Sequence, residues 1–161
     1  MSARRIVNVD PRGLRFTAAI SSVVLALAIV LGPPFGLVLL AAQTLVFAFG
    51  AVLGLQFQPY AVLFRTLVAP RLSAPAALEP EQPARFAQAM GMLISVIALL
   101  AGIVGASVVF YVFAGAALAA AFLNAAFNYC LGCDLFLRFG HISRHADLTE
   151  RRRVERDVTV G

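Results

Sequence analysis

Apolar positions gather in four long runs, and polar positions lie between and outside them, with the runs at residues 14–31, 35–55, 86–106 and 108–130. A helix rises about 1.5 Å per residue, so about 20 apolar residues cross the roughly 30 Å hydrocarbon core of a bilayer. The pattern therefore predicts an all-α, polytopic membrane protein. We expect a bundle of four transmembrane helices within residues 1–139, followed by a charged cytoplasmic tail at 140–161.

The connections between the runs differ in length and polarity. Gly32-Pro33-Pro34 is too short for anything but a tight hairpin, and the break near residues 105–107 is equally short. The long connection, residues 56–85, begins with a segment in which Tyr60, Phe64 and Leu67 share one helical face. This segment predicts a short helix lying in the membrane interface between the second and third runs.

Charge adds an orientation to this picture. All 13 basic residues are arginine, and they fall in the N-terminal segment, the long connection and the C-terminal tail. With four spans these three regions share one side, and the excess of arginine places that side in the cytoplasm. We therefore expect a multi-pass plasma-membrane protein with both termini cytoplasmic. Arginine without lysine, together with much alanine, is typical of a GC-rich bacterial genome.

Polar and small residues inside the runs indicate close packing. Gly50 and Gly54 form a G-x-x-x-G pattern, which lets another helix approach closely, within one chain more often than between chains. Gln43 and Thr44 lie near the middle of the second run, and we expect them to face neighbouring helices, where an amide can find a partner. Asp10-Pro-Arg-Gly13 has the composition of a turn before the first run.

Both cysteines lie where the fourth run ends, in Leu123-Asn-Ala-Ala-Phe-Asn-Tyr-Cys-Leu-Gly-Cys133. Two cysteines cannot form a disulfide framework. The orientation puts Cys130 and Cys133 on the cytoplasmic side, which is reducing, so we do not expect a permanent structural disulfide.

Three segments together resemble one family: Val9-Asp-Pro-Arg-Gly-Leu-Arg-Phe16, Glu79-Pro80 with Arg85-Phe86, and Leu123-Asn-Ala ending in Cys130-Leu-Gly-Cys133-Asp. The chain up to about Phe139 is similar to the bacterial membrane proteins grouped as domain of unknown function 4395. Relatives in that family are often encoded near thioredoxin-like and rhodanese-like sulfurtransferase proteins. The resemblance therefore implies thiol or sulfur chemistry with such a cytosolic partner.

Cys130 and Cys133 are the candidate redox dithiol. Their spacing puts both thiols on one side of a helix, close enough to bridge. The C-terminal end of a helix disfavours thiolate, and so does the neighbouring Asp134. This objection disappears if Gly132 ends the fourth helix and Cys133 caps a new helix that starts at Asp134. The alternative is that both cysteines are small packing residues.

Two further sites are possible on this sequence. Cys130, Cys133, His141 and His145 have the ligand types of a zinc site, although the middle spacer is short. Asn124 and Asn128 lie one helical turn apart. They could line a polar path for a small anion, with Gln43, Thr44 and Gln88 opposite. The alternative, which is more common, is that they form interhelical hydrogen bonds.

The sequence does not indicate an enzyme, a cofactor or a nucleic-acid partner. Nothing resembles a nucleotide loop or a Ser-His-Asp set, and no carboxylate lies inside the four runs. Three functions stay open: a thiol or sulfur-handling membrane protein, a non-catalytic accessory or scaffold subunit of a larger membrane complex, and a carrier of small anions or sulfur compounds. In the second, Gly50→Leu or Gly54→Leu would break the assembly while cysteine variants would not.

Overall fold

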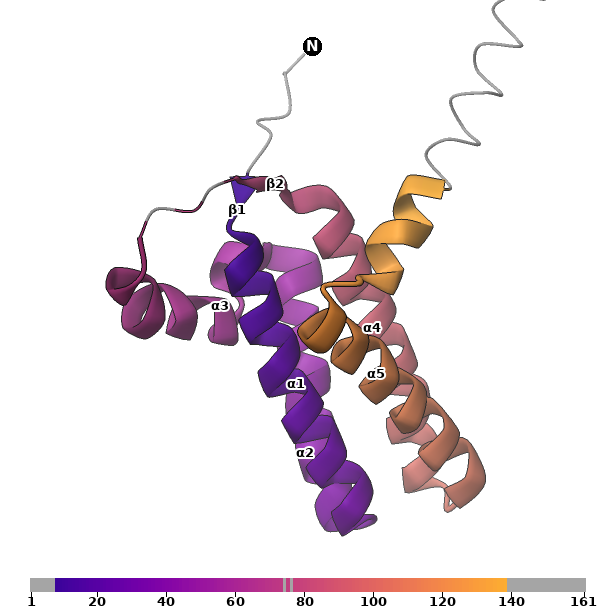
Figure 1. The fold of residues 1–161 in the computed structure, drawn as a ribbon. Helices are drawn as coiled ribbons and strands as arrows, with labels where there is room; N and C mark the ends of the chain where they lie inside the picture. Colours follow the sequence, from indigo (N-terminus) through magenta and orange to yellow (C-terminus); the bar gives the residue numbers. More distant parts are fainter. Residues whose placement is uncertain (1–7, 74, 76, 139–161) are drawn as a thin grey trace, which may run out of the picture.

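Within a computed structural model that describes residues 8–73, 75 and 77–138, four helices are long and apolar enough to cross a membrane (Figure 1). The all-α prediction is confirmed for the described residues, apart from one short strand pair. The long helices are α1 (Pro11–Leu31), α2 (Phe35–Ala48, continued by a π-helical turn at Phe49–Leu53), α4 (Glu81–Ile103) and α5 (Ser107–Phe127).

Helix α1 begins at Pro11, three residues before the predicted start at Leu14. Asp10 is its N-cap, because the Asp10 side chain accepts a hydrogen bond from the Arg12 backbone N–H at 2.9 Å. Pro11 fits the first helical position, where no backbone donor is needed. The residues predicted to form a free turn therefore form the capped start of the first span.

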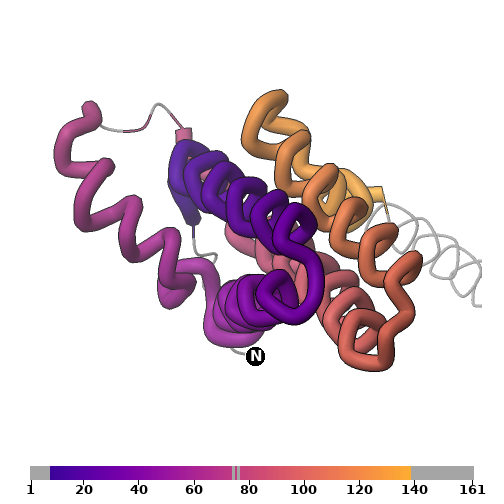
Figure 2. Tube along the Cα trace, turned by 90° about the horizontal axis from the view of Figure 1, so that it is seen from below, coloured from indigo at the N-terminus to yellow at the C-terminus, as the bar shows by residue number. Residues whose placement is uncertain are grey.

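The four long helices lie side by side (Figure 2). Helix α1 contacts α2 and α5, and α4 contacts the same two helices from the other side. Their shared core contains Leu25, Leu40, Phe47, Ala98 and Phe110. Most of the remaining large apolar side chains face outward, as Val30, Val38 and Val108 do, which suits a hydrocarbon surrounding.

A break ends α2 and starts the arm, the name used here for residues 55–71. Gly54 has φ +107°, a conformation that side chains rarely adopt, and it separates the π-helical turn from the arm. In chain order, the arm holds a 3₁₀ turn (Leu55–Phe57), the short helix α3 (Pro59–Leu63), a π-helical turn (Phe64–Val68) and a second 3₁₀ turn (Ala69–Arg71). It extends sideways from the helix ends (Figure 1). A short helix was predicted here, and its place in the membrane interface stays a prediction.

Two side chains of α4 hold this break together. Arg85 donates hydrogen bonds to Ala51 O and Val52 O, two carbonyl groups of the π-helical turn that precedes Gly54. Glu81, which is buried, accepts the backbone N–H of Leu55 through Oε1 at 2.8 Å. Arg85 therefore supplies donors to carbonyl groups at the end of the α2 extension, and Glu81 supplies an acceptor to the first backbone N–H of the arm.

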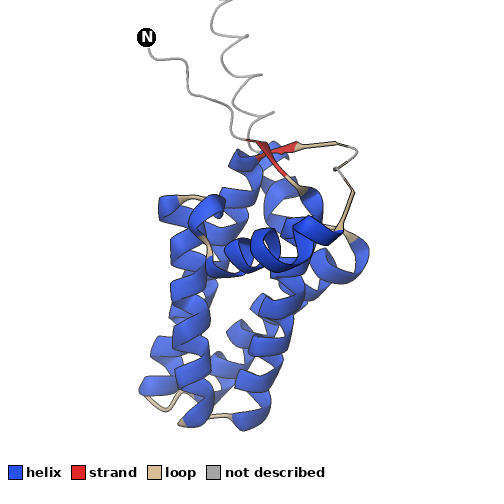
Figure 3. Cartoon of the chain, turned by 90° about the vertical axis from the view of Figure 1, so that its left-hand side faces the viewer, coloured by secondary structure: helices blue, strands red, loops and turns tan. Residues whose placement is uncertain are grey.

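One contact was not predicted. Strands β1 (Asn8–Val9) and β2 (Glu79–Pro80) pair antiparallel, with Val9 opposite Glu79. The pair lies at the ends of α1 and α4 (Figure 3). It joins two of the segments that carry the family resemblance.

Candidate functional site

Helix α5 ends at Phe127, earlier than the predicted boundary at residue 130. Asn128 adopts the left-handed conformation, with φ 54° and ψ 28°, and the next N–H, that of Tyr129, donates to Leu123 O at 3.3 Å. Asparagine tolerates this conformation better than other side chains do, so it stops the helix. The end of α5 therefore falls before both cysteines.

A new helix, called here the dithiol helix, covers residues 131–138. Cys130 is its N-cap: the backbone N–H of Cys133 donates to Cys130 Sγ at 3.3 Å, and the N–H of Asp134 donates to Cys130 O at 3.0 Å. The possible arrangement in which Gly132 ends α5 and Cys133 caps the next helix is therefore not the one that the structure has. Asn128 takes the first role and Cys130 takes the second.

This position answers the objection to a reactive thiol. The N-terminal end of a helix carries partial positive charge and free N–H groups, both of which favour a thiolate. Cys130 lies at that end. The structure joins Cys130 and Cys133 in a disulfide, with their Cα atoms 5.2 Å apart, so the predicted bridging distance is met. Both residues are half-buried.

Helix α4 supports the dithiol helix from one side. A Cβ atom placed on Gly132 would come within 2.6 Å of the Cα atom of Ala87, so only glycine fits this contact. Phe136 packs against Phe86 with ring centroids 5.6 Å apart. The glycine between the two cysteines therefore serves to dock the helix.

The dithiol helix carries an ion pair of its own. Asp134 accepts a hydrogen bond from Tyr129 OH at 3.2 Å and pairs with Arg138 at 3.0 Å. A carboxylate in the first turn stabilises the helix but opposes a neighbouring thiolate, and the guanidinium of Arg138 offsets part of that opposition. Arg15 donates to Ala125 O at the end of α5.

The other candidate site residues are two asparagines of the α5 end and two histidines. Asn124 is half-buried, while Asn128 is exposed and serves the turn. His141 and His145 lie outside the described residues. Within residues 8–73, 75 and 77–138, no group of three or more histidine, cysteine or acidic side chains could hold a metal ion.

The residues expected opposite the asparagines bond elsewhere. Gln43 is fully buried; it donates to Ser21 Oγ at 3.0 Å and accepts from Tyr60 OH at 3.1 Å. The expectation that Gln43 faces neighbouring helices is confirmed. Thr44 donates to Leu40 O in its own helix, and Gln88 accepts from Gln58. These hydrogen bonds fix α1, α2, the arm and α4 to one another.

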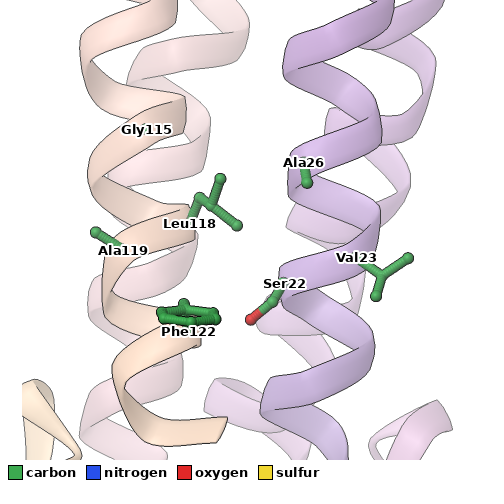
Figure 4. Close-up of a pocket in the computed structure, with 7 residues that line it drawn as sticks. All are labelled: Ser22, Val23, Ala26, Gly115, Leu118, Ala119 and Phe122. Carbon is green, nitrogen blue, oxygen red and sulfur yellow. The ribbon is translucent and has the colours of Figure 1, made fainter. Parts of the chain in front are cut away.

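An open groove of about 500 Å³ lies between α1 and α5 (Figure 4). Ser22 brings the one side-chain oxygen drawn there, and that hydroxyl already donates to Ala18 O at 2.8 Å. The other side chains that line it are apolar, with Val23, Leu118 and Phe122 among them. Such a groove suits lipid chains and offers nothing to a small anion.

The small residues of the G-x-x-x-G pattern are occupied within the chain. A Cβ atom on Gly50 would lie 3.0 Å from the Gln88 side chain, and one on Gly54 would lie 2.9 Å from Glu81 Oε1. Both glycines therefore pack against α4. A leucine at either position would disturb the fold itself, so these variants cannot separate a scaffold role from misfolding.

Comparison with protein families assigns this chain. A family model described as Domain of unknown function (DUF4395) matches residues 9–140. The chain belongs to DUF4395. The match covers the α1 cap, all four spans and the dithiol helix as far as the structure describes it, so the resemblance inferred from three segments is confirmed. Comparisons of this DUF4395 chain with curated proteins and with solved structures returned no match.

Proposed function

We propose that this DUF4395 protein is a multi-pass plasma-membrane protein whose Cys130–Cys133 pair exchanges electrons with a cytosolic thioredoxin-like protein. One observation carries the proposal: Cys130 caps the dithiol helix, and its sulfur accepts the N–H of Cys133. Backbone donors and the helix dipole favour the thiolate, which is both the nucleophile and the better leaving group in disulfide exchange.

The exchange balances without any further reactant. A thiolate of the partner attacks Cys130 Sγ, the Cys130–Cys133 bond breaks, and Cys133 leaves as a thiolate that takes up a proton. The second thiol of the partner loses its proton and attacks the partner's other sulfur in the mixed disulfide, so Cys130 leaves as a thiolate and takes up the second proton. Two electrons and two protons pass from the partner dithiol to the membrane dithiol. The reverse sequence oxidises Cys130 and Cys133 again.

The test follows from the two roles. With Cys130 as the attacking and attacked sulfur, Cys133→Ser removes the resolving thiol and traps a mixed disulfide with the partner. Cys130→Ser is the matched control and traps none. If Cys133 were the N-cap instead, Cys133 would be the attacking sulfur, and the results expected for the two variants would be exchanged. The variants are expressed in the membrane, trapped with acid and separated on non-reducing gels.

Identification of the trapped protein decides its class. A thioredoxin-like partner supports dithiol exchange. A rhodanese-like partner bound to Cys133→Ser would replace electron exchange by transfer of sulfane sulfur to Cys130. Equal trapping by both variants, or trapping by neither, contradicts the proposal and favours cysteines that only pack.

A further inference from the structure

A second site lies away from the dithiol, under the arm. A cavity of about 240 Å³ opens between the first turns of α1 and the arm. Asp10, Thr17, Gln58, Phe64 and Arg65 belong to its lining. The cavity is at the end of the helices where the charged residues gather, the level at which a spanning protein meets lipid headgroups.

The lining carries one charge of each sign, and the backbone holds each group in place. Asp10 Oδ1 accepts the N–H of Arg12 at 2.9 Å. Arg65 Nη2 donates to Gln56 O at 2.6 Å. A carboxylate has a second oxygen and a guanidinium has further N–H groups, so both keep capacity for a ligand.

A buried amide in the same lining has an unused acceptor. Gln58 is fully buried, and its Nε2 donates to Gln88 Oε1 at 3.2 Å. Its Oε1 has no hydrogen-bond partner among the described residues. A buried acceptor without a donor costs about 1–3 kcal/mol, so a donor at this cavity wall would stabilise the protein.

We propose that this cavity binds a phospholipid headgroup that carries both a phosphate and a primary ammonium, as phosphatidylethanolamine does. The phosphate pairs with Arg65, and the ammonium donates to the Asp10 carboxylate and, after a small shift of the amide, to Gln58 Oε1. A single water would satisfy Gln58 but would leave both charges unused. Val62, Leu63 and Leu67, which belong to the arm but not to the cavity lining, expose apolar side chains, a surface suited to acyl chains.

Native mass spectrometry of the full chain in detergent tests this site by titration with three lipids. Phosphatidylethanolamine is expected to bind at least about tenfold more tightly than phosphatidylcholine, whose quaternary ammonium has no N–H, or phosphatidylglycerol, which has no ammonium. Arg65→Gln should lose about tenfold, and Arg65→Lys should recover part of it. Arg71→Gln, a second exposed arginine of the arm outside the cavity lining, should change nothing.

A competition experiment identifies the source of the headgroup. Displacement of the lipid by soluble phosphoethanolamine supports the shared chemistry and a soluble ligand, whereas binding of the intact lipid alone supports a membrane ligand. Equal affinity for the three lipids overturns the proposal. An equal loss in Arg65→Gln and Arg71→Gln also overturns it, because it would show general attraction to charged lipid.

Discussion

Cys130 illustrates how one backbone position can set the chemistry of a residue. A cysteine at the end of α5 would meet the negative end of a helix, but at the start of the dithiol helix it meets the positive end. After reduction, Cys133→Ser retains only the thiol of Cys130, and Cys130→Ser retains only that of Cys133. At neutral pH the Cys130 thiol should react with iodoacetamide about fivefold faster, because the helix N-terminus stabilises its thiolate by about 1 kcal/mol. Both rates are measured by quenching the labelling at timed intervals and quantifying the product by mass spectrometry. Equal rates would remove the argument for Cys130 as nucleophile.

Asn128 makes that position possible, because its φ of 54° ends α5 two residues before Cys130. Asn128→Gly should leave stability nearly unchanged, since glycine adopts this conformation freely. Asn128→Val should lower the free energy of unfolding by about 1–2 kcal/mol. Thermal unfolding in detergent measures the difference. Asn124→Val, inside α5, is the control and should cost less; a larger loss there would mean that Asn124 forms a bond that matters more than the turn.

Gly132 decides how the dithiol helix sits on α4. Gly132→Ala would bring a Cβ atom to 2.6 Å from Ala87 Cα, a backbone atom that cannot move aside cheaply. We expect a loss of about 1–3 kcal/mol, as for overpacked contacts. Gly115→Ala on α5 is the control, because nothing lies within 4 Å of its added Cβ atom. Thermal unfolding compares the two, and equal stability would show that the dithiol helix is not docked on α4.

At the scale of elements, the break after α2 depends on two charged residues one turn apart on α4. Glu81→Leu should leave the buried N–H of Leu55 unpaired and cost about 1–3 kcal/mol, while Glu81→Gln keeps an acceptor and should cost less. Glu79→Leu, in the exposed strand β2, is the matched control. Thermal unfolding and limited proteolysis of the arm should both distinguish Glu81→Leu from Glu79→Leu, and similar profiles would show that Glu81 does not hold the break.

The spans could be predicted because lipid imposes their length and composition locally, on each stretch of sequence by itself. The pairing of Val9 with Glu79, and the hold of Glu81 and Arg85 on the break, join residues far apart in the chain. Hydropathy carries no signal for such contacts. The cap at Cys130 did have a local signal, because Asn128, two residues earlier, is a residue type that often ends a helix. That signal lies inside the fourth apolar run, so hydropathy alone extended the helix past it.

At the scale of the molecule, the charged side chains among the described residues lie at one end of the four helices. The dithiol helix, the cavity and the break after α2 lie there, and the hairpins at 32–34 and 104–106 at the other end carry no charge. Tyr60 belongs to this end: burial raises the pKa of its hydroxyl, so it stays a neutral donor to Gln43. The proposed exchange requires a fixed orientation, because a soluble partner would reach the dithiol from one side only.

The excess of arginine at that end sets the expected orientation, with the dithiol facing the cytoplasm. In a background with Cys130→Ser and Cys133→Ser, Arg71→Cys reports on the charged end, and Val104→Cys, at an exposed hairpin position, reports on the other. A membrane-impermeant maleimide should label Arg71→Cys in inverted vesicles and Val104→Cys in right-side-out cells. The reverse pattern would place the dithiol outside, where a cytosolic thioredoxin-like protein could not reach it. The cytosolic partner would then be excluded even if the two cysteines proved reactive.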